Sequence, residues 1–375
     1  MIPPDRWSAR AQTALRNDQA QLLVVLAGTE TAAVPGISAA GATPQSRRFT
    51  AAADAELLWG GPDGARPHAL PPLPAGVSPA LISWVAQQRL QLPQLVVDAG
   101  AAVAPAVPHL QLGLPPAVCL SSGAAMAPAV VERLLQRGRQ LGGGFRRCHP
   151  EGLLVIAECV PGGTSTAEAL LRGLGVCAAG VVSGSLREPP HSLRDALVQR
   201  GLAAMTARGI GAESPLQVLA AMGDPFQAMA LGVLQGLLLP ASSEAGPQAL
   251  LAGGSQMLAV AGLMMATLPE AERATCNDQI AVVTTAWVMQ EPGSNVELLA
   301  QRLAERWGVW PRLFSSDLRF EGCRQQALLD YECGYVKEGV GAGGLAWLTQ
   351  LAGMSPQALA AACDQACRQL LRVEP

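Results

Sequence analysis

The chain has 375 residues, of which 50% are hydrophobic, 15% charged and 4% aromatic. This composition excludes a disordered chain, because disordered chains are poor in apolar residues and rich in charge. The formal net charge of −3 leaves no basic excess for contacts with a phosphate backbone, so nucleic acid is not an expected partner.

Cysteine and histidine usage predicts neither disulfides nor a metal site. The nine cysteines include no Cys-x-x-Cys pair, and the four histidines are scattered along the chain. We therefore expect free thiols in a cytoplasmic protein, with no metal ion and no cofactor. Charged residues within the first twenty positions, among them Arg10 and Arg16, argue against a secretory signal.

Strands and helices are predicted in alternation along the whole chain. In order, the sequence predicts a helix over 7–18, a strand over 21–27, a loop over 60–79, a helix over 79–90, a strand over 94–97, a helix over 128–141, a strand over 152–157, and helices over 164–174, 193–207, 214–222 and 225–238. It then predicts a strand over 249–252, a helix over 256–266, a strand over 280–288, and helices over 295–307, 324–333, 345–351 and 355–371.

This alternation is typical of an α/β protein with a doubly wound, mostly parallel, Rossmann-like sheet. We expect a single domain over 1–375, with its core sheet over about 20–345 and a small helical part formed by about 1–20 and 346–375. The predicted helices 225–238 and 256–266 carry more apolar surface than one covering layer requires. Such a surplus is commonly hidden at a symmetric interface, so a homodimer is expected.

One segment leaves a membrane alternative open. Residues 249–268 contain no charge and are nearly long enough to span a bilayer. The polar and glycine-rich break at 253–256 favours a strand, a turn and a buried helix instead, and the flanks lack basic and aromatic interface anchors.

In such a sheet, ligands bind beyond the carboxyl ends of the strands. The strongest candidate segment follows the strand predicted over 152–157 and leads directly into a helix. Its glycines would let a phosphate approach the main chain, and the helix N-terminus offers unpaired N–H donors. The alternative is an ordinary helix cap. The candidate residues of this segment are Glu158, Gly162, Gly163, Thr164, Ser165 and Thr166.

A second glycine-rich segment contains a single carboxylate, Glu338, which follows Lys337 and precedes Gly339 and Gly341. A solvated Lys–Glu turn is the alternative here. The chain has no Gly-Lys-Ser/Thr triplet of a phosphate-binding loop and no dinucleotide-binding glycine fingerprint, so neither ATP nor NAD is expected. Asp224, which precedes Pro225, is accounted for as a helix cap.

Taken in order, these segments resemble the nicotinate-nucleotide:dimethylbenzimidazole phosphoribosyltransferase family, in a divergent branch, over about residues 22–347. Val97-Asp98-Ala99-Gly100 matches the family's Val-Asp-Ala-Gly strand end. The segment 122–126 resembles its polar loop. The segment 158–166 resembles its Glu-x-Gly-x-x-Asn-Thr-Thr loop, and 338–342 matches its Glu-Gly-x-Gly-Ala motif.

The resemblance implies transfer of a phosphoribosyl group from nicotinate mononucleotide to a benzimidazole-type base, for the lower ligand of cobalamin. Glu338 would be the general base, and residues 162–166 would hold the phosphate. Glu158 would orient the ribose or the base, and Gly339, Gly341 and Ser122 would complete the substrate-binding set.

Two departures from the family pattern leave alternatives open. Gly163 stands where the family usually has asparagine, and Lys337 stands where it usually has glycine. An inward-pointing Lys337 could pair with a substrate carboxylate or phosphate. The alternatives are the same reaction with another acceptor, such as adenine, and a nucleotide-binding protein without catalysis.

Overall fold

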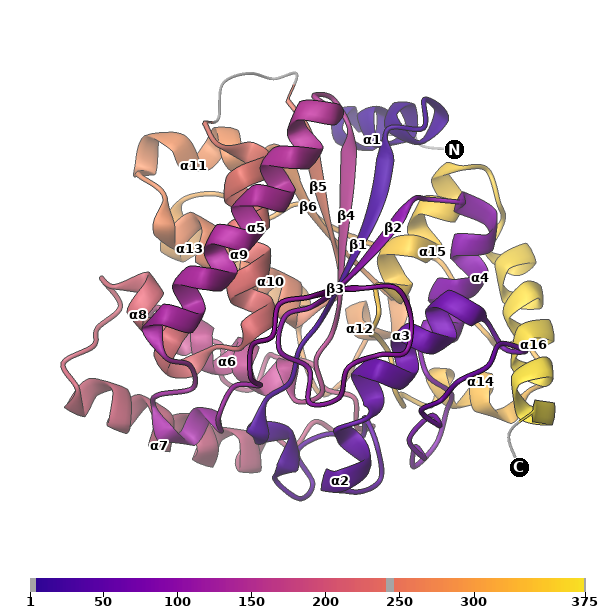
Figure 1. The fold of residues 1–375 in the computed structure, drawn as a ribbon, viewed down its shortest axis with the longest axis horizontal. Coiled ribbons are helices and arrows are strands. Elements are labelled where there is room, and N and C mark those ends of the chain that lie inside the picture. The colour runs from indigo at the N-terminus through magenta and orange to yellow at the C-terminus, as the bar shows by residue number, and fades with distance from the viewer. Residues whose placement is uncertain (1–4, 241–245, 374–375) are drawn as a thin grey trace.

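The computed structural model describes residues 5–240 and 246–373. At its centre lies a seven-stranded sheet in the order β3-β2-β1-β4-β5-β6-β7, in which every neighbouring pair is parallel (Figure 1). The strands are β1 (Ala20–Leu26), β2 (Gln94–Asp98), β3 (Leu110–Gln111), β4 (Leu153–Cys159), β5 (Gln248–Ala252), β6 (Ile280–Thr284) and β7 (Leu313–Ser315). The chain runs from β1 to one edge and returns to β4 on the other side, so the predicted doubly wound fold is confirmed.

Alternate residues of the central strands face opposite cores, as the two-residue period of a strand requires. In β1, Leu23 and Val25 face one core, whereas Leu22 and Val24 face the other. The first core is covered by α5 (Pro128–Cys148), α6 (Gly163–Gly173), α7 (His191–Ala207), α8 (Pro215–Met222), α9 (Pro225–Leu238), α10 (Ser255–Thr267) and α13 (Val296–Trp307). The second is covered by α1 (Arg6–Arg16), α3 (Thr50–Gly60), α4 (Ala80–Leu90), α14 (Gln326–Glu332), α15 (Ala342–Leu351) and α16 (Pro356–Val373).

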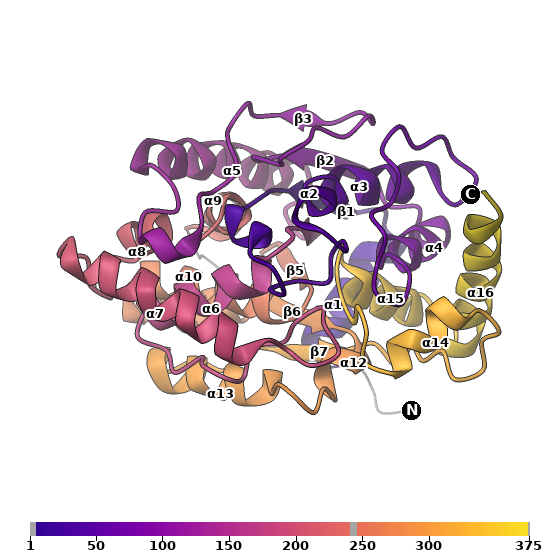
Figure 2. The ribbon, with the colours of Figure 1, turned by 90° about the horizontal axis from the view of Figure 1, so that it is seen from below.

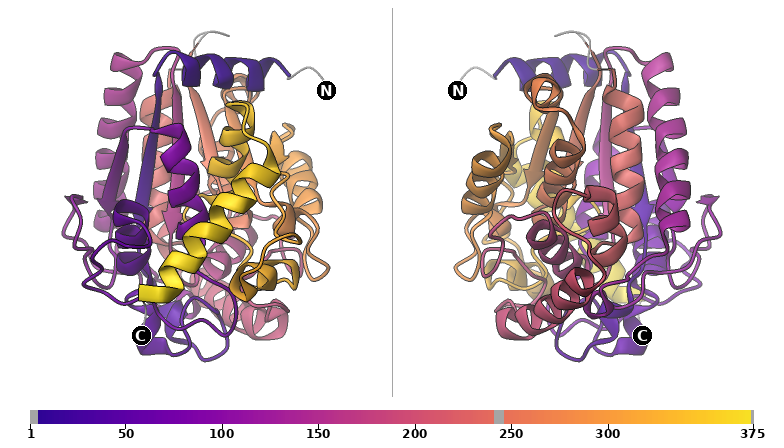
Figure 3. Two further views of the ribbon diagram at one scale, coloured as in Figure 1. Left: turned by 90° about the vertical axis from the view of Figure 1, so that its right-hand side faces the viewer. Right: turned by 90° about the vertical axis from the view of Figure 1, so that its left-hand side faces the viewer.

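Among the described residues, five shorter helices lie in the connections between these elements. They are η1 (Glu30–Ala33), α2 (Pro44–Arg47), η2 (Leu120–Ser122), α11 (Glu270–Asn277) and α12 (Ala286–Met289). Figure 3 shows α1 across the end of the sheet where the strands begin. In its left view, α16 (yellow) runs obliquely over the side of the molecule that faces the viewer. Trp7 of α1 is buried and its ring lies 6.2 Å from the rings of Phe314 and Trp347. The terminal helices therefore share the second core with the strands.

The sheet and its covers also settle how residues 249–268 are arranged. They form the end of β5 and the helix α10, whose apolar side chains are buried beside α6 and α13. In the ranges 5–240 and 246–373, no helix is both long and apolar enough to cross a membrane.

Several local predictions differ from the structure. The helix predicted over 128–141 continues to Cys148 as α5, and the helix α11 was not predicted. The apolar run 280–288 is not one strand: β6 ends at Thr284, and Thr285 caps α12 by accepting a hydrogen bond from the Val288 N–H. Helix α3 was not predicted, because nine of its eleven residues are buried on all sides and leave no amphipathic period. The strands β3 and β7 are too short, at two and three residues, to show a pattern.

Helices α5 and α9 pack at unusually close range through glycines. A Cβ atom added to Gly142 would lie 2.1 Å from the Val233 carbonyl oxygen, and one added to Gly232 would lie 2.4 Å from that of Leu135. The apolar surface of α9 is therefore covered by α5 and the sheet within one chain. The surplus that suggested a homodimer is buried inside the molecule, and the homodimer stays a prediction.

This close contact makes the two sides of α5 respond differently to one added methyl group. We expect Gly142→Ala to lower the free energy of unfolding by at least about 1 kcal/mol, because the helices must move apart. Gly143→Ala, whose Cβ would meet only Arg147 Nη1 at 3.6 Å and the Gly236 carbonyl oxygen at 3.7 Å, should instead stabilise the protein by about 0.5–1 kcal/mol through higher helix propensity. Urea unfolding of both variants measures the difference, and equal effects would contradict the close packing.

Candidate active site

A cavity of about 230 Å³ opens beyond the carboxyl ends of β4, β5 and β6. Figure 2 views the molecule from this end, where the loops that follow the strands gather. The cavity is lined by 158–164 after β4, 183–185, 254–256 after β5, 336–340, and the proline-rich loop 70–79, together with Asp54 from α3. The two segments singled out in the sequence, 158–164 and 336–340, thus face one space, although about 180 residues separate them.

The first segment turns from β4 into α6 without a side-chain cap. Gly162 is the cap residue and has φ 85°, a left-handed conformation that favours glycine. A Cβ atom on Gly163 would lie 3.0 Å from Gln256 Nε2, so no larger residue fits there without a shift. Gly162, Gly163 and Thr164 line the cavity at the N-terminus of an eleven-residue helix. This end of the cavity has the geometry that suits an anion.

The next two residues of this segment point behind the cavity wall. Thr166 Oγ1 lies 2.5 Å from Asp224 Oδ2, which also accepts a hydrogen bond of 2.8 Å from Gln256 Nε2. Ser165 is fully buried, and its hydroxyl has no hydrogen-bond partner among the described residues. Asp224 does cap α9, as the sequence suggested, because it accepts a 3.0 Å bond from the Gln227 N–H. Its second oxygen, Oδ2, accepts the hydrogen bonds from Thr166 and Gln256 and so stabilises the turn behind the candidate phosphate site.

The carboxylate of Glu338 accepts four hydrogen bonds. Thr284 Oγ1 and the Thr285 N–H donate to Oε2 at 3.0 and 2.9 Å, and the N–H groups of Gly339 and Gly343 donate to Oε1 at 3.1 Å each. These donors favour the ionised form, but burial outweighs them and raises the pKa of Glu338 to about 7. A carboxyl group with a pKa near neutrality is suited to act as a general base.

Glu158 lies in the same compartment with a different environment. Burial, followed by the negative charge of Asp224, raises the pKa of Glu158 to about 8, and the carboxyls of Glu338 and Asp54 contribute in the same direction. The main chain of the two loops is also joined, because the Val340 N–H donates to the Glu158 carbonyl oxygen at 3.0 Å. At neutral pH Glu158 therefore holds its proton and can donate a hydrogen bond to a ligand, while Glu338 accepts one.

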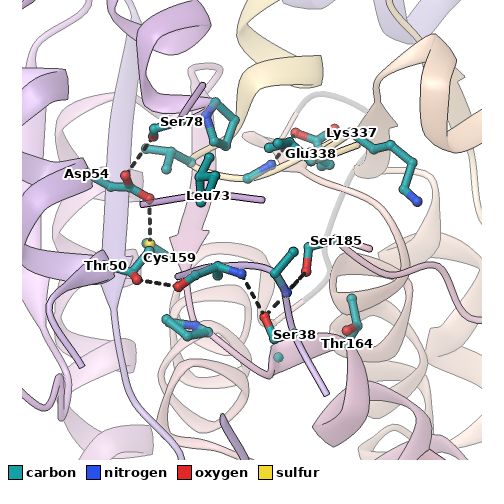
Figure 4. Close-up of a pocket in the computed structure, with 18 of the residues that line it drawn as sticks. Ser38, Thr50, Asp54, Leu73, Ser78, Cys159, Thr164, Ser185, Lys337 and Glu338 are labelled. Atoms are coloured by element: carbon teal, nitrogen blue, oxygen red, sulfur yellow. Dashed lines mark hydrogen bonds between the residues drawn. The ribbon is translucent and has the colours of Figure 1, made fainter. Parts of the chain in front are cut away.

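Lys337 is not part of a solvated turn. Only 1% of its side chain is exposed, and Nζ lies 2.6 Å from Glu291 Oε1 and 2.6 Å from the Leu186 carbonyl oxygen. Burial lowers the pKa of Lys337, and the Glu291 carboxylate opposes this effect. Figure 4 shows the lysine side chain extending away from Glu338. Of the two orientations that the sequence left open, the side chain has the buried one, and its partner is a protein carboxylate.

Asp54 was missed by the sequence analysis. Its carboxyl accepts hydrogen bonds from Ser78 Oγ at 2.6 Å and from Cys159 Sγ at 3.2 Å (Figure 4). Burial raises the pKa of Asp54 to about 6. Thr284 and Thr285 were missed as well, because a continuous strand was expected there. The pair of threonines that ends an apolar run was the one available signal.

Two further candidates lie elsewhere. Ser122 is exposed at the end of η2, where its hydroxyl accepts a 3.1 Å bond from the Ala124 N–H, and it does not line the cavity. Gly341 lies behind the cavity wall as the cap of α15, with φ 77°, and a Cβ there would lie 2.7 Å from the Ala157 Cβ. Gly339 lines the cavity beside Glu338.

The raised pKa of Glu158 predicts a cost to stability in alkaline solution. A carboxyl whose pKa rises on folding favours the folded state only while it is protonated, so stability is lost as the pH rises from about 4.5 through about 8. Glu158→Gln should therefore increase the free energy of unfolding by at least about 1 kcal/mol at pH 9 and leave it unchanged at pH 4. Urea unfolding at both pH values tests this. Glu132→Gln, on the exposed side of α5, is the control and should show no such difference.

Comparison with known proteins gives the chain's family. No protein-family model matches it. The UPF0284 protein of Prochlorococcus marinus (strain MIT 9313) is 50% identical over 360 residues, which cover 93% of this chain and 86% of that protein. The UPF0284 protein of Gloeobacter violaceus (strain ATCC 29082 / PCC 7421) is 44% identical over 360 residues, with coverage of 96% and 89%.

Two solved structures from Thermus thermophilus have a similar fold. One is of CobT, with a TM-score of 0.56 and 22% identity over 98% of this chain and 92% of that one. The other is of a nicotinate-nucleotide-dimethylbenzimidazole phosphoribosyltransferase, with a TM-score of 0.56 and 19% identity over 99% and 93%. The resemblance predicted from the motifs is thus confirmed in the fold. On the identity shared with its relatives across nearly its whole length, the chain belongs to the UPF0284 family.

Proposed function

We propose that this protein is a pentosyltransferase that moves a 5-phosphoribosyl group from nicotinate mononucleotide to a ring nitrogen of a benzimidazole-type base. The observation that carries the proposal is the placement of Glu338, a carboxyl with a pKa near neutrality, in the same cavity as a glycine-rich helix N-terminus. The shared fold with a phosphoribosyltransferase supports the same reaction class. The product would serve as the lower ligand of cobalamin, made in the cytoplasm.

The donor's phosphate would bind at Gly162, Gly163 and Thr164. The helix dipole and main-chain N–H groups there favour an anion. From this anchor the ribose would extend toward Glu158 and Glu338, and a protonated Glu158 would donate a hydrogen bond to a ribose oxygen. The apolar residues of the loop 70–79, among them Leu73, would cover the flat face of the acceptor base.

The reaction needs one general base and no general acid. A ring nitrogen of the acceptor attacks C1′ with its lone pair, and the bond between C1′ and the pyridinium nitrogen breaks. The bonding electrons return to that nitrogen, so nicotinate leaves as a neutral pyridine ring without needing a proton. The acceptor must lose the proton of its other ring nitrogen, and Glu338 takes it.

The first test replaces the base. Glu338→Gln should lower turnover by about 10²- to 10⁴-fold and leave binding of nicotinate mononucleotide nearly unchanged, because the amide keeps the size but cannot take the proton. In the wild type, turnover should fall as the pH drops below about 7, where Glu338 becomes protonated.

Nicotinate release measured with 5,6-dimethylbenzimidazole and with adenine decides between acceptors. Glu321→Gln, which changes an exposed carboxyl that does not line the cavity, is the control. Equal rates for Glu338→Gln and the wild type would remove Glu338 from the mechanism. Binding of the mononucleotide without release by any acceptor would identify a non-catalytic nucleotide-binding protein.

A second test addresses the phosphate site. Gly163→Val should weaken binding of nicotinate mononucleotide on the order of tenfold or more, because the added side chain meets Gln256 and Val160 at the helix N-terminus. Gly322→Ala, with nothing within 4 Å of the added atom, should bind like the wild type. Calorimetric titration measures both. Unchanged affinity of Gly163→Val would place the phosphate elsewhere.

A further inference from the structure

The segment around Glu338 has a backbone conformation that its sequence does not favour. Val336, Lys337 and Val340 have φ of 63°, 66° and 52°, which is the left-handed region. Side chains with a Cβ atom rarely adopt it, and branched valines least of all. Such strain persists only where the surrounding structure fixes the backbone, and it is common at functional sites.

The side chain of Lys337 is one of the contacts that fix this backbone. Its Nζ bridges Glu291 Oε1 and the Leu186 carbonyl oxygen at 2.6 Å each, and it is buried. Glu291 in turn accepts a 2.6 Å bond from Ser294 Oγ on its other oxygen. Both acceptors of the lysine belong to the protein, and only 2% of the Glu291 side chain is exposed. Two of the three N–H donors of Nζ are therefore used within the protein.

Residues at both ends of the short helix α12 bind the strained segment. At its start, Thr285 donates from its main-chain N–H to Glu338 and from Oγ1 to the Lys337 carbonyl oxygen, at 2.9 and 2.6 Å. Just beyond its end lies Glu291, which binds Lys337 Nζ. The lysine therefore ties the residue before Glu338 to the same helix whose first turn binds the Glu338 carboxylate.

A buried ion pair is a poor way to gain stability, because both charges lose their hydration. The best-supported reason to keep one is that it specifies a single conformation. Arg194, which is also buried, lies near enough to influence Lys337 and donates to the carbonyl oxygens of Val182 and Ser183, of which Ser183 lines the cavity. The charged residues here thus fix loops that line the cavity.

We propose that the Lys337–Glu291 ion pair is a positioning element that holds the strained segment 336–341 and thereby aims the Glu338 carboxylate, and that Lys337 does not bind substrate. This inference rests on the proposed function, in which Glu338 is the base. Without this ion pair, the segment relaxes toward ordinary φ values, and the hydrogen-bond donors of Gly339, Gly343 and Thr285 separate from the Glu338 carboxylate. A displacement of about 1 Å is enough to cost on the order of 100-fold in rate.

The experiment compares Lys337→Met with the charge-free double variant Lys337→Met/Glu291→Gln. Lys337→Met should lower kcat by about 10- to 100-fold with the KM for nicotinate mononucleotide unchanged within about threefold. The double variant should recover the melting temperature, because no buried charge is left unpaired, but it should not recover kcat. Lys337→Arg, which keeps the charge, should retain most of kcat. The control Arg312→Met removes a partly exposed ion pair with Asp5 at the end of the sheet where the strands begin, away from the cavity, and should lower stability without lowering kcat.

The pH profile separates positioning from simple loss of stability. Loss of hydrogen-bond donors raises the pKa of a carboxylate, so the acidic limb of kcat/KM should move to higher pH in both variants that contain Lys337→Met. The other titratable groups that face Glu338 are Glu158, Asp54 and Tyr331, and they are the same in every variant. A raised KM with an unchanged kcat would show that Lys337 binds substrate. Recovery of kcat in the double variant would show that only the unpaired charge mattered, and either result overturns the proposal.

A measurement that does not depend on turnover tests this proposal even if the proposed function is wrong. If the wild type transfers phosphoribosyl to no acceptor, hydrogen exchange of the Val340 and Gly343 amides still shows whether the ion pair holds the segment. Both amides donate hydrogen bonds in the folded protein. Their exchange should speed up at least tenfold in the double variant and stay unchanged in Arg312→Met. Unchanged exchange in the double variant would overturn the proposal.

Discussion

Several carboxyl groups are buried in one cavity, and their mutual repulsion limits how many of them can be ionised at once. Asp54, Glu158 and Glu338 line it and Asp224 lies directly behind it, whereas the one lysine of the lining is bound to Glu291. Charges this close and this dry cannot all be ionised together. The structure resolves the conflict by unequal hydrogen bonding: Glu338 receives four donors, whereas the pKa of Glu158 is lowered only by the Val160 N–H. This favours the ionised form of Glu338 relative to that of Glu158.

The parallel sheet is what brings these groups together. Its strands all end at one edge. Glu158 near the end of β4 therefore lines the cavity, and Thr284 at the end of β6 binds the Glu338 carboxylate, with β5 between the two strands. The glycine-rich turn at 339–343 then inserts against this edge, where the Gly341 cap packs on Ala157. Loops after parallel strands need supply only short segments, because the sheet has already fixed their starting points.

Much of this arrangement follows from the sequence, because hydrophobic period and turn residues are local signals. The strands β1, β2, β4 and β5 could be predicted in that way, whereas placing the segments around Glu158 and Glu338 in one site rested on the resemblance to a family. Asp54 could not, since α3 is buried all round and carries no amphipathic pattern. Glu291 could not either, because it contacts Lys337 across 46 residues and belongs to no motif. Contacts of that kind depend on tertiary packing, which a single sequence does not display.

Lys337 shows how one backbone conformation can be reached by two routes. In the family that the motifs resemble, glycine usually stands before the glutamate, and glycine adopts a left-handed φ at no steric cost. Its disadvantage is entropic, because an unfolded glycine has more conformations to lose. Lysine at φ 66° reverses both effects: the folded backbone is strained, but the unfolded chain is more restricted and the side chain can bind a distant partner. The conformation around Glu338 is then determined by a buried contact with Glu291 rather than by the freedom of one residue, which couples the geometry of the Glu338 carboxylate to the loop after α12.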